Sequence, residues 1–281
     1  MTPIATGDLM SHLDPTAVAL ELLEARAAGR SIQTPPSSRD ASFDLSRAYS
    51  VEAELVRIRT SQGRRTVGRK VGYANKALWR MLNLETLVWA HMYDDTVHHA
   101  ADNVRTPAVA EMVSPKIEPE IVFKLKGEIA GQTDPGAVLA AVEWIALGFE
   151  IIDCPFPDWS FQPADFVAAF GLHAALIVGT PRPVDRDQID ALLEDLARFK
   201  VRLLKNEQLV AEGGGRNVLR SPALCLAELA TATSGRQDAT ALAAGELVSS
   251  GTLTESQPIA SGETWTATLD GLELPSLTVR T

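Results

Sequence analysis

The sequence is poor in several residue types and patterns that mark large classes of proteins. It has two cysteines, Cys154 and Cys225, and no Cys-x-x-Cys pair, so neither a disulfide framework nor a thiolate metal site is expected. No apolar run reaches the roughly 18 residues that a membrane-spanning helix needs. The first residues also lack the basic and then apolar pattern of a signal peptide. These absences predict a cytoplasmic protein without a membrane span.

Positive charge is scarce as well. The chain has 26 Lys and Arg against 36 Asp and Glu, a net charge of −10 at pH 7 and a pI near 5.0. Nucleic acids and anionic membranes repel such a chain, so we expect neither as a partner. Motifs for nucleotide phosphates are missing, because no Gly-x-Gly-x-x-Gly occurs and no Gly-Lys-Ser/Thr follows Gly213-Gly214-Gly215. We interpret these three glycines as a tight loop.

What remains is an ordinary globular composition, with 46% hydrophobic and 22% charged residues. Asp14-Pro15 is a typical helix start, and apolar residues at helical spacing predict helices over 17–28 and 46–61. We therefore predict a helical N-terminal portion, residues 1–65, followed by a larger domain, residues 66–281.

From Thr66 the sequence changes to short β-rich segments interrupted by Gly and Pro. The apolar patterns predict three strands in the first half of this domain, over 67–73, 112–125 and 148–153. They also predict helices over 76–89, 135–146 and 222–232. Strands and helices do not alternate regularly enough for a doubly wound sheet, so the predicted fold class is α+β with a sheet-rich core.

The most informative stretch is Ile117-Glu118-Pro119-Glu120-Ile121, in which one residue separates two carboxylates. Side chains at i and i+2 of a strand point to the same face, so the two glutamates are expected side by side. A third carboxylate, Glu150, lies in the equally apolar stretch 149–153. Burying like charges is costly unless a cation lies between them, and three carboxylates suit a hard divalent cation. The alternative is a solvated strand edge, where most glutamates are found.

Four segments, taken together with their order and spacing, carry a family resemblance. They are Gly68-Arg69-Lys70-Val71-Gly72, Pro115-Lys116-Ile117-Glu118-Pro119-Glu120-Ile121-Val122-Phe123, Phe149-Glu150-Ile151-Ile152-Asp153 and residues 242–254. The chain resembles the fumarylacetoacetate hydrolase superfamily over about residues 15–281. Within it, the chain is most similar to the branch of 2-keto-4-pentenoate hydratase and 4-oxalocrotonate decarboxylase. The resemblance implies an α+β fold with a mixed β-sheet roll or barrel core and a catalytic domain at 66–281.

The resemblance also implies a metal site and a reaction. Glu118, Glu120 and Glu150 would hold Mg²⁺ or Mn²⁺, and three carboxylates leave coordination positions for a bidentate 2-oxo acid. A metal held in this way stabilises an enolate, which serves hydration and decarboxylation alike. The implied activity is a lyase acting on a small 2-oxo or 2-hydroxy-dienoic acid, and related enzymes are homo-oligomers.

Further site residues follow from the same resemblance. Lys70 corresponds to an active-site lysine, and the flanking Gly68 and Gly72 would let a ligand approach closely. The alternative for Lys70 is a surface lysine in a salt bridge. The implied substrate-binding residues come from the lysine segment and from a Ser/Thr/Gly loop near the C-terminus: Val71, Gly72, Gly251 and Thr252. Ordinary turn chemistry is the alternative for that loop.

Two departures from the family pattern concern the general base. Where related hydratases often have an acidic residue, this chain reads Leu87-Val88-Trp89, and their Asp-Asn pair near residue 173 is absent. His173 stands near the place of that pair and is a candidate base, and the favoured alternative is a core or hydrogen-bonded histidine. Asp94, in Asp94-Asp95, corresponds to an acidic pair of the family and is a second catalytic candidate, with capping as its alternative.

Two other functions stay open at this point. One is the C–C hydrolase activity of the wider superfamily on an acylpyruvate, which tends to use an aspartate as third ligand and a His-Glu pair near the N-terminus. Neither feature is visible here. The other is a catalytically reduced homologue that binds a metal and a keto acid, which the two departures motivate.

Overall fold

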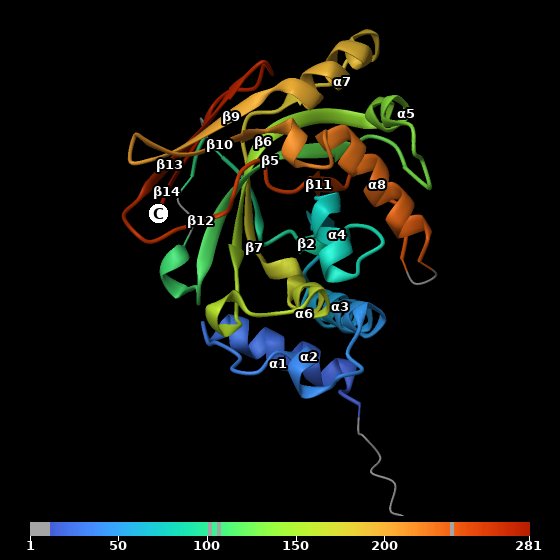
Figure 1. The fold of residues 1–281 in the computed structure, drawn as a ribbon, viewed down its shortest axis with the longest axis vertical. Helices are drawn as coiled ribbons and strands as arrows, with labels where there is room; N and C mark the ends of the chain where they lie inside the picture. Colours follow the sequence, from blue (N-terminus) through green and yellow to red (C-terminus); the bar gives the residue numbers. More distant parts are fainter. Residues whose placement is uncertain (1–11, 101–102, 106–107, 237–238) are drawn as a thin grey trace, which may run out of the picture.

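A computed structural model of the chain describes residues 12–100, 103–105, 108–236 and 239–281. Its strands form a nine-stranded and a five-stranded sheet, and the larger one curls around the middle of the molecule (Figure 1). The larger sheet runs β2-β1-β11-β5-β6-β7-β3, with β12 added to β5 and β8 added to β6. Its strands are β1 (Thr66–Gly72), β2 (Val88–Tyr93), β3 (Val97–His99), β5 (Pro115–Leu125), β6 (Val142–Asp153), β7 (His173–Val178), β8 (Arg182–Pro183), β11 (Leu247–Ser249) and β12 (Gln257–Pro258).

The smaller sheet has the order β10-β9-β13-β14-β4 and lies at the far end from the N-terminal helices (Figure 1). Its strands are β4 (Val104–Arg105), β9 (Lys200–Lys205), β10 (Gln208–Gly214), β13 (Thr264–Asp270) and β14 (Leu277–Arg280). The helices are α1 (Pro15–Ala27), α2 (Pro36–Arg39), α3 (Leu45–Ser61), α4 (Lys76–Leu82), α5 (Pro135–Ala140), α6 (Pro163–Ala168), α7 (Ile189–Arg198) and α8 (Pro222–Ser234). The predicted mixture of helices and strands is present.

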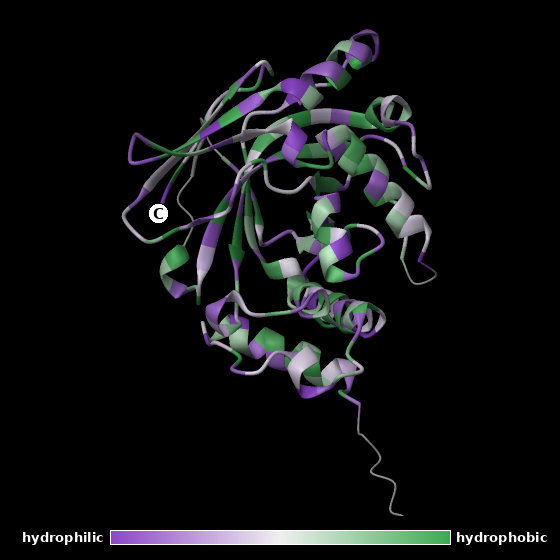
Figure 2. Ribbon diagram, in the orientation of Figure 1, coloured by the Kyte–Doolittle hydropathy of each residue, from purple (hydrophilic) through white to green (hydrophobic). Residues whose placement is uncertain are grey.

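The long antiparallel pair of β5 and β6 is the centre of the larger sheet. Its residues are buried almost throughout, with Ile121, Phe123 and Phe149 fully inaccessible to solvent. Hydrophobic residues line these central strands, whereas hydrophilic residues gather at outer turns such as the one between β9 and β10 (Figure 2). β5 and β6 therefore form a rigid, desolvated platform, on which any polar side chain needs a partner.

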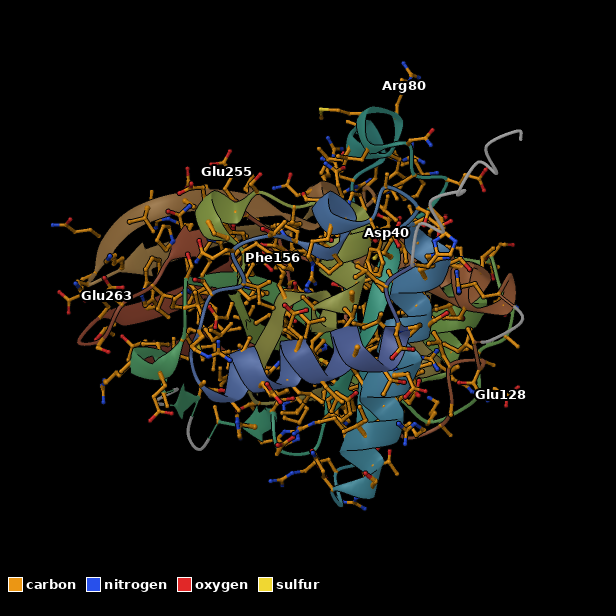
Figure 3. The ribbon with its side chains drawn as sticks, turned by 90° about the horizontal axis from the view of Figure 1, so that it is seen from below. Asp40, Arg80, Glu128, Phe156, Glu255 and Glu263 are labelled. Atoms are coloured by element: carbon orange, nitrogen blue, oxygen red, sulfur yellow. The ribbon has the colours of Figure 1, made fainter. Side chains whose placement is uncertain are left out.

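The N-terminal helices pack at one end of the sheet. Helices α1 and α3 cross each other there, as the view from below shows (Figure 3). Asp14 caps α1 by accepting a hydrogen bond from the Ala17 amide at 2.9 Å, and Asp44 caps α3 in the same way through Arg47. The predicted change from helices to strands thus falls between α3 and β1. The division into two domains at residue 65 stays a prediction.

A buried aspartate fastens the N-terminal portion to the rest of the chain. Asp165 of α6 is fully buried and accepts hydrogen bonds from the amides of Ser37 and Gln162, each at 2.8 Å. The Ser37 hydroxyl donates to the same carboxylate. A charged acceptor with three donors satisfies its lone pairs without water, so this contact fixes α2 against α6.

Two predicted helices are too long. The helix predicted over 76–89 ends at Leu82, because Asn83 adopts a left-handed conformation (φ 53°) and β2 begins at Val88. The helix predicted over 135–146 ends at Ala140, and β6 starts at Val142. Residues 142–146 pair with β5, and this long-range pairing overrides their local helical pattern.

The tight loop predicted at Gly213-Gly214-Gly215 is also wrong, since Gly213 and Gly214 are the last residues of β10. A Cβ atom on Gly213 would lie 2.0 Å from the Leu253 carbonyl oxygen, and one on Gly215 would lie 1.9 Å from that of Leu196. These glycines therefore serve close backbone packing. In the part of the chain that the structure describes, no helix has the length and apolarity to cross a bilayer.

The Asp165 contact leads to a stability prediction. Asp165→Ala removes a buried charged acceptor and leaves the Ser37 and Gln162 amides without a partner, so we expect the free energy of unfolding to fall by about 3 kcal/mol. Urea unfolding followed by circular dichroism measures this loss. Ser37→Ala removes one donor and should cost about 1 kcal/mol. Equal stability of Asp165→Ala and the wild type would contradict the anchoring role.

Candidate metal centre and active site

The register of β5 against β6 brings three glutamates together. Glu118 lies directly opposite Glu150 in this pair, and Glu120 follows two residues later on the same face. One carboxylate oxygen from each of the three lies within 4.8 Å of the others. The side-by-side arrangement predicted from the Glu-Pro-Glu spacing is therefore present, and the third carboxylate joins it as predicted.

The environment of these carboxylates opposes negative charge. Glu120 and Glu150 are fully buried, while Glu118 is partly exposed to a cavity. Enclosure by the protein raises the pKa of Glu118 and of Glu120 to about 8 each, and it also raises the pKa of Glu150. The charge of Glu150 adds to the increase at Glu120. Three carboxylates held in this way need a compensating positive charge.

The donor set fits a divalent cation. The buried Glu120 Oε1 accepts no hydrogen bond from any described residue, although most buried polar atoms have a partner. Three carboxylates at this spacing supply the all-oxygen ligands that Mg²⁺ and Mn²⁺ prefer. Glu118, Glu120 and Glu150 would hold the ion.

The last residue of β11 and the loop after it orient Glu120. The Ser249 hydroxyl and the Gly251 amide both donate hydrogen bonds to Glu120 Oε2, the latter at 2.9 Å. These donors hold one oxygen and leave Oε1 available to a metal, as outer partners of metal ligands commonly do. The role of Ser249 was not predicted, although it lies in the loop segment that carries the family resemblance.

Pro119 interrupts the strand pairing of β5 and so lets the loop of residues 250–256 reach the glutamates. β11 pairs with residues 122–124 of β5 and β12 pairs with 116–117, so the stretch between has no strand partner on this side. The Pro119 carbonyl accepts from the Leu253 amide at 2.9 Å, which puts the proline nitrogen on the same side. Because proline has no N–H, the ladder is interrupted there and residues 250–256 can arch away.

Lys70 supplies positive charge beside the cluster. The residue is 2% exposed, and its Nζ lies 3.1 Å from Glu150 Oε2 and donates to the Gly171 carbonyl at 2.9 Å. Burial opposes the charge of Lys70, but the three glutamates outweigh it and raise the lysine pKa. The predicted lysine therefore lies in the site as an ammonium. Gly171, which was not among the predicted site residues, adopts φ 59° and leaves space for the lysine side chain.

His173 lies behind Glu150. Its Nδ1 is 2.8 Å from Glu150 Oε1 and its Nε2 is 2.9 Å from Thr96 Oγ1, so both ring nitrogens are engaged by the protein. Burial, with help from Arg26 and Lys70, lowers the histidine pKa well below its usual range. A neutral ring that donates from Nδ1 then accepts at Nε2. The catalytic role predicted for His173 stays a prediction, and these contacts favour positioning Glu150.

The backbone of His173 is held from the N-terminal portion. Arg26 of α1 donates to the His173 carbonyl at 2.5 Å and to the Ala174 carbonyl at 3.0 Å. Its guanidinium also stacks on the Phe170 ring at 4.8 Å from the centroid. Helix α1 therefore braces the side of the site that faces away from the cavity.

Asp94 is not brought to the cluster. It pairs with Arg65, accepting from the amide and from Nε at 3.2 Å each. The register partner of Lys70 on β2 is Ala90, so Asp94 lies four residues farther along, about 13 Å at the usual rise. Its assignment as catalytic stays a prediction without support from the geometry. Leu87, Val88 and Trp89, where related hydratases often carry an acid, are all buried.

A cavity of about 440 Å³ opens onto Lys70 and Glu118. All four residues predicted to bind substrate line it: Val71, Gly72, Gly251 and Thr252. The Gly251 amide is used by Glu120 and the Thr252 hydroxyl donates to the Thr254 carbonyl, but the Thr252 amide donates to no described residue. That amide is available to a ligand carboxylate.

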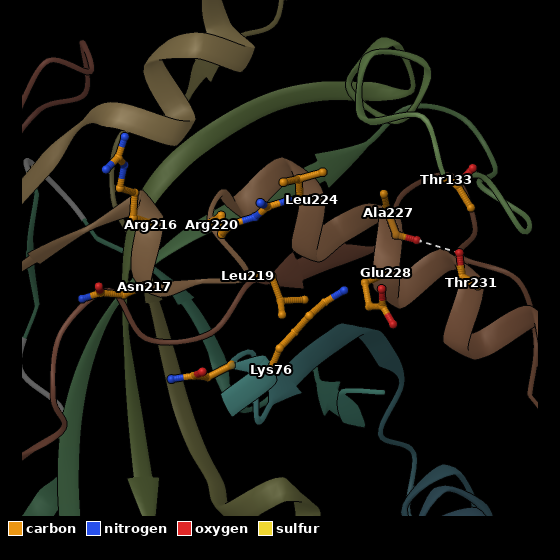
Figure 4. Close-up of a pocket in the computed structure, with 11 residues that line it drawn as sticks. Lys76, Thr133, Arg216, Asn217, Leu219, Arg220, Leu224, Ala227, Glu228 and Thr231 are labelled. Atoms are coloured by element: carbon orange, nitrogen blue, oxygen red, sulfur yellow. Dashed lines mark hydrogen bonds between the residues drawn. The ribbon is translucent and has the colours of Figure 1, made fainter. Parts of the chain in front are cut away.

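A larger cavity, of about 630 Å³, lies between α4 and α8 and contains none of the three glutamates (Figure 4). It adjoins the first through two shared residues, Asn75 and Asn217. By its chemistry the smaller cavity is the candidate functional cavity, because both Lys70 and Glu118 are among the described residues that line it.

The glycines of the lysine segment serve the protein and not a ligand. A Cβ atom on Gly68 would lie 1.9 Å from the Leu247 carbonyl oxygen, and one on Gly72 would lie 2.4 Å from the Phe166 ring. The predicted space for a ligand beside these two residues is therefore filled by β11 and by α6. Gly72 still borders the cavity.

Two relatives share most of the chain. 2-Hydroxyhexa-2,4-dienoate hydratase from Comamonas testosteroni is 29% identical over 255 residues, which are 89% of this chain and 92% of that enzyme. 2-Hydroxypent-2,4-dienoate hydratase from Pseudomonas putida is 30% identical over 206 residues, which are 72% of this chain and 87% of that enzyme. No family model matches the chain.

Solved structures agree. 4-Oxalocrotonate decarboxylase from Pseudomonas putida G7, complexed with magnesium and adipate, superposes with a TM-score of 0.84 at 25% identity, covering 95% of this chain and 96% of that one. A Mn²⁺- and pyruvate-bound fumarylpyruvate hydrolase from Pseudomonas aeruginosa shares the fold, with a TM-score of 0.57. The chain therefore belongs to the fumarylacetoacetate hydrolase superfamily, in its branch of 2-keto-4-pentenoate hydratases and 4-oxalocrotonate decarboxylases. The predicted fold and the lyase class are confirmed, and the two solved structures named above hold the kinds of divalent metal that were predicted.

The metal centre leads to a binding prediction. Losing an outer partner of a metal ligand typically weakens affinity 10- to 100-fold, so losing a direct ligand in Glu118→Gln should weaken Mn²⁺ binding by roughly 100-fold or more. Isothermal titration calorimetry measures the affinity. Glu128→Gln makes the same change of charge at an exposed position (Figure 3) and should bind Mn²⁺ like the wild type. Equal affinities of the two variants would remove Glu118 from the ligand set.

Proposed function

We propose that the chain is a divalent-metal-dependent lyase that adds water to a 2-hydroxydienoic acid or removes CO₂ from an oxalocrotonate-like acid. The observation that carries this proposal is the convergence of Glu118, Glu120, Glu150 and Lys70, of which Glu118 and Lys70 line the cavity. The names of the relatives supply the class of substrate, because they act on 2-hydroxy-dienoates. Water addition yields a 4-hydroxy-2-oxo acid, and decarboxylation yields a 2-hydroxydienoate and CO₂.

The residues of the chain divide the work. When bound, Mg²⁺ or Mn²⁺ supplies electrophilic stabilisation for the negative charge that develops on the 2-oxo acid head group. The Lys70 ammonium adds a second positive charge and a proton donor, fixed in place by Glu150 and the Gly171 carbonyl. Thr252 lines the same cavity, and its amide would orient the substrate carboxylate.

His173 enters the proposal as a positioning residue. It holds Glu150 Oε1 through Nδ1, and Thr96 in turn holds its Nε2. Such a relay fixes the orientation of a metal ligand. No described side chain of the cavity stands out as a general base, so a water molecule activated within the site is the simplest source of the added hydroxyl.

The two other functions have less support. The relatives that span most of the chain are hydratases and a decarboxylase, and the third ligand is a glutamate, which differs from the expectation for acylpyruvate hydrolases. A catalytically reduced homologue is disfavoured because the three glutamates and Lys70 are all in place. Homo-oligomer formation and a cytoplasmic location stay proposals, and light scattering of the purified protein tests the first.

The role of Lys70 makes a prediction that separates catalysis from metal binding. Lys70→Met should lower kcat by about 10²–10³, because it removes a fixed charge at the reacting head group. Its Mn²⁺ affinity should not fall, since the ammonium repels a second cation. The assay follows ultraviolet loss of 2-hydroxypenta-2,4-dienoate with Mg²⁺ and with EDTA, and mass spectrometry identifies the product.

The matched control for this variant is Lys76→Met, which removes an exposed lysine near the second cavity. It should keep wild-type turnover. Unchanged turnover in Lys70→Met would exclude Lys70 from the reaction. Turnover by the wild type in EDTA would contradict the metal-dependent chemistry as a whole.

A further inference from the structure

Four aromatic rings form one wall of the functional cavity. They follow each other in contact: Tyr73 and Phe166 with centroids 5.2 Å apart, Phe166 and Phe161 at 6.5 Å, and Phe161 and Trp159 at 6.3 Å. All four line the cavity. Lys70 Nζ lies 4.9 Å from the Phe166 centroid, so the second ring of the row lies beside the reacting end, and Phe161 and Trp159 follow it along the wall. Nothing in the proposed chemistry of the head group requires this wall.

A hydrogen bond and strained backbone conformations hold the aromatic wall in place. The indole N–H of Trp159 donates to Ser114 Oγ at 2.8 Å, which uses the polar atom of that ring within the protein. Asp158, Trp159 and Tyr73 have φ angles of 54°, 55° and 56°, a left-handed conformation that non-glycine residues rarely adopt. Strained residues of this kind cluster at ligand sites. The rings therefore present fixed apolar faces to whatever occupies the cavity.

Charge along the cavity is unsuited to a second carboxylate. Among the described residues that line it, the one cation is Lys70, whose ammonium is already held by Glu150 and the Gly171 carbonyl. Glu255 adds a carboxylate at the exposed rim. The ammonium of Lys116 lies 3.7 Å from the Trp159 centroid and does not line the cavity. An anionic tail would lose water and meet rings and a like charge.

The neighbouring cavity offers no clear alternative. Three cationic side chains are among the described residues that line it: Lys76, Arg216 and Arg220. Their charged groups point in different directions, because the Lys76 ammonium lies toward Glu228 and the Arg216 guanidinium points away from Glu228 (Figure 4). All three are exposed residues. A carboxylate that left the functional cavity past Asn217 would not meet a convergent site.

We propose that the substrate is a monoacid whose tail, beyond the 2-oxo or 2-hydroxy-dienoate head, is apolar and extends along the ring wall. This inference rests on the proposed function and narrows its class of substrate. The cavity volume of about 440 Å³ equals roughly fifteen water molecules, which is more than a short dienoic acid and a metal ion fill. Each methylene added along the wall should then improve binding up to about fourfold until the wall ends.

Unreactive 2-oxo acids test this inference by binding alone. The matched pair is 2-oxoadipate and 2-oxo-6-methylheptanoate, in which an isopropyl group replaces the second carboxylate. We expect the isopropyl compound to bind the Mn²⁺-loaded protein at least tenfold more tightly, and a series from 2-oxobutanoate to 2-oxoheptanoate to tighten with length. Titration calorimetry gives the affinities. Equal or tighter binding of 2-oxoadipate would overturn the inference and leave the proposed function intact.

Two variants test which residues produce the preference for an apolar tail. Phe161→Ala should flatten the dependence on chain length and leave the affinity for 2-oxobutanoate unchanged, because that ring lies away from the head group. Lys116→Met should leave the preference for the isopropyl compound unchanged. A selective loss of 2-oxoadipate binding in Lys116→Met would show that this lysine serves a diacid, against the inference. If no 2-oxo acid binds in the presence of Mn²⁺, the proposed function fails and the inference fails with it.

Discussion

The burial of three carboxylates around one point is the constraint on which the rest of this structure depends. The β5–β6 register that places Glu118 opposite Glu150 also desolvates them, and their raised pKa values show that the protein alone compensates their charge only in part. Lys70, Ser249, Gly251 and His173 all act on this imbalance by supplying charge or hydrogen bonds. A divalent cation would complete the compensation, so metal binding and the stability of the core would be coupled.

Elements far apart in the sequence meet at this point. Helix α1 reaches the site through Arg26, which holds the backbone of His173, and α2 is tied to α6 through Asp165. α6 in turn supplies Phe166, whose ring fills the space beside Gly72 and touches Lys70. The N-terminal helices thus support both the metal ligands and the aromatic wall, which gives a physical reason for their presence in a chain whose chemistry lies in the sheet.

Much of this site could be predicted from local patterns. The period of a strand places Glu118 beside Glu120, and the caps at Asp14 and Asp44 start α1 and α3 where they are found. What could not be predicted depends on long-range pairing or on main-chain atoms. Residues 142–146 become a strand only because β5 lies next to them. The contacts of Lys70 with the Gly171 carbonyl and of His173 with Thr96 leave no local trace in the sequence.

The break in strand pairing at Pro119 also separates the shape of the cavity rim from the placement of the three glutamates. Since β5 has no strand partner beside this residue, the arch of residues 250–256 meets β5 through single contacts, in which the Leu253 amide donates to the Pro119 carbonyl and the Gly251 amide donates to Glu120. The metal ligands, in contrast, are fixed by the pairing of β5 with β6 on the other side. Substitutions at the outer part of the arch, at Glu255 or Ser256, can therefore change the rim of the cavity without moving the three glutamates.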